Sequence, residues 1–215
     1  MKNYFKNIKN KEFIISIICL MGVQAAFYAG LKLLQADFRV LNYDIDNKIP
    51  FIPQVILIYN LFYPVVFFTF YNIFNHDKDT YYKGIIAGII GFVITDIIFI
   101  LYPTIIIRPD VTNMNIDPIN KFIIYWTYKI DSPAINCLPS IHCLFCFQGI
   151  FSSLMCKNYN NKVKIPMIIM LFFIIITTVL VKQHYFADII AALIVSAFAT
   201  LISPLIYKKL KSTKY

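Results

Sequence analysis

Residues 84–107 read GIIAGIIGFVITDIIFILYPTIII, with Asp96 as the one charged side chain in the run. A helix that crosses the hydrocarbon core of a bilayer needs about 20 consecutive apolar residues, so this run by itself predicts a transmembrane helix. The whole chain agrees, because 59% of its 215 residues are hydrophobic and 14% are charged, whereas soluble domains average about 45–50% and about 25%. The composition therefore excludes an ordinary cytosolic protein and predicts a membrane protein.

Further apolar runs flank residues 84–107 on both sides, each bounded by charged residues, Pro or Asn. The first run is longer than the roughly 7–15-residue core of a secretory signal, so it predicts a retained anchor. Trp126 and its neighbouring tyrosines predict a short interfacial helix over 118–130. The sequence thus predicts an all-α polytopic membrane protein that forms a single membrane-embedded domain over residues 1–215. The six predicted spans cover residues 13–35, 52–74, 84–107, 140–156, 165–181 and 186–207.

The distribution of lysines predicts the orientation of these spans. Lysines are concentrated in the N-terminal tail, in segments 75–83 and 157–164, and in the C-terminal tail, and they are sparser in 36–51 and 108–139. Loops rich in Lys and Arg stay in the cytoplasm, so both termini are predicted to be cytoplasmic, in a plasma membrane. Frequent Asn, Ile and Lys are typical of an AT-rich bacterial genome. The orientation of the spans in the membrane therefore accounts for the formal charge of +9. The charge gives no reason to predict a nucleic-acid partner. The tail lysines are Lys2, Lys6, Lys9, Lys11, Lys208, Lys209, Lys211 and Lys214.

Three glycines and one acid stand out within the third predicted span. Gly84, Gly88 and Gly91 follow one another at spacings of four and three, which places them on one helix face where a neighbouring helix can approach closely. Asp96 lies near the middle of the span, where an acid is costly. It is either a buried acid that is protonated or hydrogen-bonded to a neighbouring helix, or a proton or cation relay in a small transporter. The absence of an inverted repeat favours the packing interpretation.

The five cysteines predict no disulfide framework, because their number is odd and four of them lie in apolar runs. Cys143 and Cys146 are one helical turn apart inside a span, and we expect both to pack in the core. Cys137 lies outside the spans, and the sequence leaves its role open.

A group of polar residues is predicted to meet at the outer membrane boundary. His142 begins the fourth span and His184 precedes the sixth, so the two imidazoles lie at one depth. Asp188 follows His184 by four residues and can hold the imidazole by its ring N–H if the helix has begun. Ser140, after a proline, marks a helix start that can bind an anion. With Arg108 at the end of the third span, these residues predict a phosphate pocket that contains a nucleophile and an acid.

The motif Pro139-Ser140-Ile141-His142, followed by His184 and then Asp188, resembles the second and third signature motifs of the type 2 phosphatidic acid phosphatase superfamily. Its phosphate pocket is shared with vanadium haloperoxidases. The resemblance covers most of the chain, because six spans with all motifs on one face is the arrangement of the membrane branch. Four segments are similar to the inositolphosphorylceramide synthase and sphingomyelin synthase-like group: Ile49-Pro50-Phe51-Ile52-Pro53, Tyr102-Pro103-Thr104 before Arg108, Cys137-Leu138-Pro139-Ser140 before His142, and Lys182-Gln183-His184-Tyr185 before Asp188.

Two positions depart from the phosphatase pattern. The pattern places Lys at position 101, where this chain has Leu101, and Arg at position 178, where it has Thr178. Both departures remove a phosphate-binding cation, and the synthase-like group departs in the same way. Lys182, two residues before His184, is predicted to return one charge to the pocket.

The resemblance implies a metal-independent lipid phosphate phosphohydrolase that uses no cofactor and acts at the outer membrane face. It implies that His184 attacks phosphorus to give a phosphohistidine while Asp188 orients the ring. His142 is expected to protonate the departing alkoxide and then to activate the acceptor.

The same resemblance implies that Arg108, Ser140 and Lys182 hold the phosphate oxygens of a lipid phosphate substrate. Water as the acceptor gives a phosphatase, whereas a hydroxyl of another head group gives a phosphotransferase of the inositolphosphorylceramide or sphingomyelin synthase type. The sequence leaves open this choice, the identity of the lipid and the oligomeric state. A non-catalytic scaffold, by contrast, would tolerate loss of both outer histidines.

Overall fold

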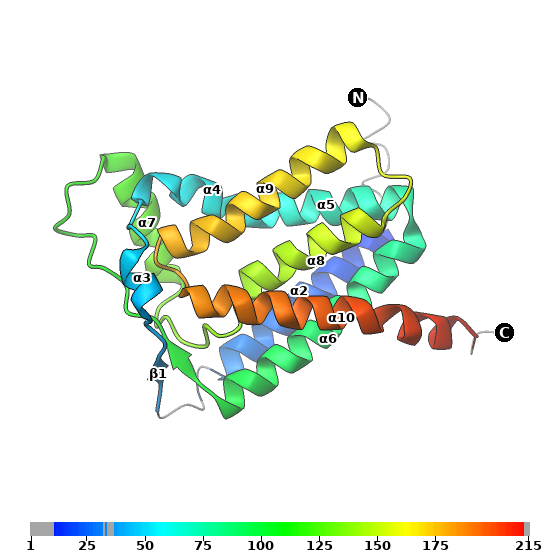
Figure 1. The fold of residues 1–215 in the computed structure, drawn as a ribbon, viewed down its shortest axis with the longest axis horizontal. Coiled ribbons are helices and arrows are strands. Elements are labelled where there is room, and N and C mark those ends of the chain that lie inside the picture. The colour runs from blue at the N-terminus through cyan, green and yellow to red at the C-terminus, as the bar shows by residue number, and fades with distance from the viewer. Residues whose placement is uncertain (1–10, 32, 34–36, 213–215) are drawn as a thin grey trace.

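The structure, a computed structural model, describes residues 11–31, 33 and 37–212. Its long helices run side by side along one axis (Figure 1). By length and composition, five segments can cross a membrane, and α8 (Ile141–Met155) is a shorter apolar helix. The chain is therefore a multi-pass, essentially all-α membrane protein, as predicted. The five segments are α2 (Lys11–Leu31), the interrupted helix Pro53–His76, α6 (Lys78–Leu101), α9 (Asn161–Leu180) and α10 (Phe186–Ser212).

The second and third predicted spans differ most from the observed helices, while α9 begins four residues before the predicted fifth span and α10 ends five residues after the predicted sixth. The third span was predicted to reach residue 107, but α6 ends at Leu101. Pro103 has no N–H to donate and disfavours helical backbone at the residue before it. Residues 104–105 instead form strand β2 (Thr104–Ile105), which pairs in parallel with β1 (Arg39–Val40). The second span is divided into η1 (Pro53–Val55), α4 (Ile56–Asn60) and α5 (Phe62–His76).

Some sequence predictions fall outside the described residues. The predicted end of the first span, residues 34–35, is among them, and so are the tail lysines Lys2, Lys6, Lys9 and Lys214.

The centre of the bundle is α8, which packs against α5, α6, α9 and α10. Its residues Cys143, Leu144 and Cys146 are completely buried, and Phe145 is nearly so. The prediction that Cys143 and Cys146 pack in the core is confirmed. Because α8 is surrounded by the other helices, its first turn is held rigidly inside the bundle.

The glycine face of α6 explains how closely its neighbours approach. A Cβ added at Gly91 would lie 2.8 Å from Nε2 of Gln148 in α8, and one added at Gly88 would lie 3.1 Å from the Leu20 side chain in α2. At Gly84 the nearest atom is Oγ of Ser152, at 2.9 Å. The three glycines therefore serve close helix packing, as their spacing predicts.

Asp96 is hydrogen-bonded across the interface between α2 and α6. Nε2 of Gln24 donates to Oδ1 of Asp96 at 3.0 Å, and both side chains are buried. A buried polar group needs such a partner, so this contact agrees with the packing interpretation of Asp96.

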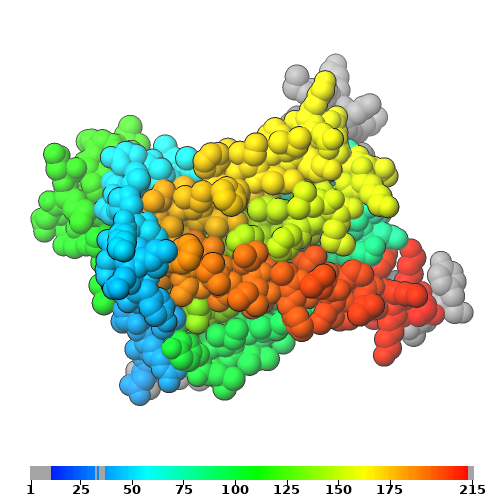
Figure 2. Space-filling view, viewed as in Figure 1, coloured from blue at the N-terminus to red at the C-terminus, as the bar shows by residue number. Residues whose placement is uncertain are grey.

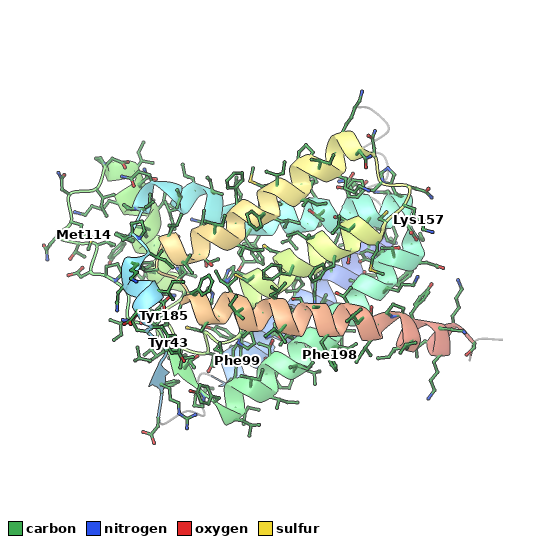
Figure 3. The ribbon with its side chains drawn as sticks, viewed as in Figure 1. Tyr43, Phe99, Met114, Lys157, Tyr185 and Phe198 are labelled. Carbon is green, nitrogen blue, oxygen red and sulfur yellow. The ribbon has the colours of Figure 1, made fainter. Side chains whose placement is uncertain are left out.

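The two ends of the bundle differ in structure. One end gathers β1, β2, α3 (Asp44–Lys48) and α7 (Pro118–Ile130), and α7 has the bounds predicted for the helix over 118–130. The labelled side chains of Tyr43, Met114 and Tyr185 lie at this end, and Lys157 lies at the other (Figure 3). At that other end, Lys78 at the start of α6 pairs with Glu12 of α2 at 2.8 Å.

Substitution of Gly91 tests the close approach of α6 and α8. Gly91→Ala is expected to lower the free energy of unfolding by about 1–3 kcal/mol, because the new methyl group would displace Gln148, which is already bonded to the Ala87 carbonyl oxygen. The measurement is thermal unfolding of the purified protein in detergent. Gly22→Ala in α2 is the control, since no atom of the described residues lies within 4 Å of its Cβ position. Equal stability of the two variants would contradict this account.

Candidate active site

The turn between α9 and α10 carries His184. Lys182 adopts left-handed backbone, with φ of 51°, and this reverses the chain after α9. The backbone N–H groups of Gln183 and His184 then both donate to the Thr178 carbonyl oxygen, at 2.9 and 3.1 Å. His184 is consequently fixed against the end of α9, and its side chain is buried. Thr178, where the phosphatase pattern has an arginine, contributes a backbone acceptor to this turn.

His184 contacts Asp188 as the sequence predicts, but for a different structural reason. His184 lies before α10, which begins at Phe186, so the two residues do not share a helical face. Asp188 instead reaches back to the start of its own helix, where Oδ2 accepts hydrogen bonds from the Tyr185 N–H at 2.9 Å and from Nδ1 of His184 at 3.1 Å. This is the reciprocal half of a capping box. Asp188 thus orients the imidazole and caps α10 with one oxygen.

A segment more than 130 residues earlier in the chain braces the same turn. Oδ1 of Asp46, in α3, accepts a hydrogen bond of 2.7 Å from the N–H of Phe186, the first residue of α10. Residues 37–52 lie across the end of the bundle where α10 begins (Figure 2). The first N–H groups of a helix have no partner within the helix, so Asp46 supplies an acceptor that the local sequence lacks.

Lys182 belongs to this brace. Its Nζ donates to the carbonyl oxygens of Asp46 at 3.0 Å and Ile49 at 2.6 Å. Burial lowers the pKa of Lys182, and the nearby Asp46 carboxylate acts in the opposite direction. The structure therefore directs the ammonium group toward α3, whereas the sequence analysis predicted that it faces a bound phosphate.

The first turn of α8 brings His142 to His184. Oγ of Ser140 accepts a hydrogen bond from the Cys143 N–H at 3.2 Å and so caps α8, and the Ser140 N–H donates to the Asp188 carbonyl oxygen at 3.2 Å. The two helix starts are thereby joined. The ring centroids of His142 and His184 lie 5.9 Å apart. The predicted meeting of the two imidazoles is present.

Aromatic residues from the second span enclose His142. Its Nε2 lies 3.2 Å from the hydroxyl of Tyr59, and its ring packs edge-on against Phe62 with centroids 4.6 Å apart. The segment before α8 is held by Thr104 of β2, whose Oγ1 accepts from the N–H groups of Cys137 and Leu138 at 3.0 and 3.1 Å. These contacts fix the position of the imidazole.

The two histidines line a cavity of about 310 Å³. An apolar groove of about 340 Å³ between α2 and α5 adjoins it, because Met21, Phe62, Tyr63 and Phe145 line both. The cavity therefore has a polar region at the histidines and an apolar extension along the helices. Its polar lining residues are Gln24, Tyr28, Tyr63, Asp131, Asn136, His142, Gln183 and His184.

Arg108 lies behind the wall of this cavity. Its NH2 group donates to Oδ2 of Asp131 and to Oε1 of Gln183, two side chains that line the cavity. NH1 donates to the carbonyl oxygens of Tyr128 and Asp131, both at 3.2 Å, and the guanidinium carbon lies 4.9 Å from the centroid of the Tyr128 ring. The predicted arginine thus reaches the site, with side-chain partners between it and the cavity.

The sequence analysis did not identify Asp46, Tyr59, Asp131 and Gln183. Gln183 could have been suspected, because it adjoins His184 and is a polar residue at the outer boundary. The other three come from segments without a recognisable motif, and only the packing of distant segments brings them to the histidines.

The bundle and its cavity define a membrane enzyme of the phosphatase type. The chain belongs to the PAP2 superfamily, which matches residues 85–212, more than half of its length. Members of this family are phosphatases and phosphotransferases, so the substrate is a phosphate ester. The matched region contains Arg108, His142, His184 and Asp188. No curated protein and no solved structure matches the chain.

Removal of the Asp46 carboxylate tests the brace on the His184 turn. Asp46→Ala is expected to destabilise the protein by about 0.5–2 kcal/mol, the usual effect of losing a helix N-cap, because the Phe186 N–H would lose its acceptor. Asp46→Asn is the matched control, since its amide oxygen can still accept that hydrogen bond. Thermal unfolding in detergent measures both variants. An Ala variant as stable as the Asn variant would show that the brace contributes nothing.

Proposed function

We propose that the protein is a lipid phosphate phosphohydrolase that works through a phosphohistidine at the outer membrane face. The observation that carries the proposal is the bond from Nδ1 of His184 to the buried carboxylate of Asp188, with the ring of His142 across the same cavity. A histidine that donates from Nδ1 keeps the lone pair of Nε2 for attack. The imidazole is itself the nucleophile, so the proposed reaction needs no metal.

In the first step, Nε2 of His184 attacks phosphorus, an N–P bond forms and the P–O bond to the lipid alcohol breaks. Protonated His142 gives its proton to the departing oxygen. The Asp188 carboxylate stabilises the positive charge that develops on the His184 ring. In the second step, neutral His142 takes a proton from water, the water oxygen bonds to phosphorus, and the N–P bond breaks to release inorganic phosphate.

A helix N-terminus and a nearby positive charge form the proposed phosphate-binding site. Ser140 begins α8 beside His142, and a helix N-terminus favours an anion. Arg108 supplies positive charge from behind the cavity wall. For Lys182, the bonds to Asp46 and Ile49 favour a role in bracing the turn over direct contact with phosphate.

A lipid substrate is supported by the apolar groove between α2 and α5. The groove shares four lining residues with the histidine cavity, so an acyl chain in it would place a phosphate at the histidines. Burial of apolar groups favours such binding. A water-soluble phosphate ester would leave this surface unused.

The proposed topology has six spans in one domain, with α8 as the fourth. Its 15 residues cover roughly 22 Å at about 1.5 Å per residue, less than a bilayer core of about 30 Å. The shortfall fits a helix whose N-terminus lies at the floor of a cavity. Among the described residues, the lysine-rich segments 75–83 and 157–164 and the end of α10 lie at the end opposite to α3 and α7. The positive-inside rule therefore favours cytoplasmic termini and an outward site in a plasma membrane.

A second candidate function is head-group phosphotransfer of the inositolphosphorylceramide or sphingomyelin synthase type. The observation that favours it is the pairing of Arg108 with Asp131. With Leu101 and Thr178 at the two departing positions, a phosphomonoester dianion would meet little unpaired positive charge, whereas a phosphodiester carries a single negative charge. A lipid hydroxyl would then replace water in the second step.

Phosphate release by purified protein in EDTA tests the proposed hydrolase. We expect release from a lipid phosphate or prenyl pyrophosphate to survive EDTA, and His184→Ala and Asp188→Asn to lower turnover by more than about 1,000-fold. His76→Ala is the matched control, since His76 ends α5 and bonds to the Asn72 carbonyl oxygen away from the cavity. An active His184→Ala enzyme would refute the covalent mechanism. No release from any lipid phosphate, together with transfer from a labelled phospholipid to an alcohol, would favour the second function.

The dependence of turnover on pH tests the roles of the two histidines, His184 as nucleophile and His142 as proton donor. His184 must be neutral to attack and His142 must be protonated to donate, so the rate is expected to fall at both low and high pH. The measurement is kcat/KM between pH 5 and 9. A rate that rises monotonically across this range would contradict the assignment.

A further inference from the structure

The hydrogen bonds of Arg108 occupy its terminal N–H groups within the protein. A guanidinium has five N–H donors. Both donors of NH1 are used by backbone carbonyl oxygens, and NH2 contacts Asp131 and Gln183. The remaining donor, on Nε, is buried and has no partner among the described residues. A phosphate in the cavity therefore meets the side chains in front of Arg108 before it meets the guanidinium itself.

Gln183 is one of two cavity-lining side chains that are bonded to Arg108, and it is the neutral one. It is 1% exposed and lines the cavity together with both histidines. Arginine has no acceptor, so the amide oxygen of Gln183 faces Arg108 and its amide NH2 is left to find another partner. That Nε2 group is buried without a hydrogen-bond partner among the described residues. A buried amide group without a hydrogen-bond partner destabilises the fold, so its presence here needs an explanation.

We propose that Nε2 of Gln183 donates a hydrogen bond to a phosphoryl oxygen of the substrate, and that Arg108 acts through this amide. The inference rests on the proposed function and names a further substrate-binding residue for it. A cation bonded to the amide oxygen polarises the amide and strengthens the donor on its nitrogen. A neutral donor of this kind suits a chain that has Leu101 and Thr178 where the phosphatase pattern has two cations.

The position of Gln183 suits stabilisation of the transition state. The backbone N–H groups of Gln183 and His184 donate to the same Thr178 carbonyl oxygen. The residue that carries the proposed donor and the nucleophile are therefore adjacent in one hydrogen-bonded turn. Negative charge is spread over the equatorial oxygens during phosphoryl transfer, and a hydrogen-bond donor held next to the nucleophile can stabilise that charge.

Two substitutions separate this role from a purely structural one. Gln183→Met removes the donor at similar volume, and Gln183→Glu keeps an acceptor for Arg108 while it presents a carboxylate to the phosphate. Turnover of dioctanoyl phosphatidic acid and the affinity for orthovanadate are measured for both. We expect each variant to lower kcat roughly 100- to 1,000-fold, as for loss of one oxyanion donor, and to weaken orthovanadate binding. Gln148→Met is the control, because Gln148 is also fully buried but bonds to the Ala87 carbonyl oxygen in the core.

The result that overturns the proposal is a Gln183→Glu enzyme within a few-fold of the unmodified protein, since that variant retains an acceptor for Arg108 but lacks the donor and adds a negative charge beside the phosphate. Full orthovanadate affinity in a folded Gln183→Met variant would do the same. If the unmodified protein binds orthovanadate but hydrolyses no phosphate ester, the proposed hydrolase fails while the binding comparison still tests Gln183. If it neither binds orthovanadate nor turns over any substrate, both proposals fail together.

Discussion

The buried carboxylate of Asp188 is the constraint on which the site depends. It is inaccessible to solvent, and a carboxylate in such a place must be hydrogen-bonded or it destabilises the fold. Oδ2 is satisfied by the Tyr185 N–H and Nδ1 of His184, and the backbone oxygen of the same residue accepts from Ser140. One residue therefore sets the start of α10, the orientation of His184 and the attachment of α8. The juxtaposition of the two histidines follows from this arrangement.

The polar residues around Asp188 come from separate segments of the chain, and these segments satisfy one another's hydrogen-bonding groups within the protein. The turn after α9 is braced by Asp46 and Lys182, which satisfy backbone groups of one another's segments. The cavity wall is ordered by Arg108, which holds Gln183 and Asp131 in place. Each of these contacts satisfies a buried donor or acceptor, and the same contacts define the shape and charge of the cavity.

Membership of the PAP2 superfamily establishes the class of reaction. The side chains around the histidines establish how the site of this protein is arranged. The positive charge near the histidines is shared with Asp131, and the amide of Gln183 lies between Arg108 and the cavity. Under the proposed function, such a site binds phosphate with directed hydrogen bonds more than with net charge. An apolar groove adjoins the histidine cavity, with which it shares four lining residues.

From the sequence alone, the apolar runs determined a multi-pass helical protein, and the spacing of Gly84, Gly88 and Gly91 determined which face of α6 packs closely. Local patterns were sufficient because the length of an apolar run and the period of a helix are properties of neighbouring residues. The meeting of His142 and His184 was also predictable, since both mark helix starts at one depth. Only the tertiary structure decided that Lys182 turns toward α3, that Asp46 caps α10 and that Arg108 is paired with Asp131 and Gln183. These contacts join segments far apart in the chain, and a side chain with several donors takes whichever acceptors the packing of helices brings within reach.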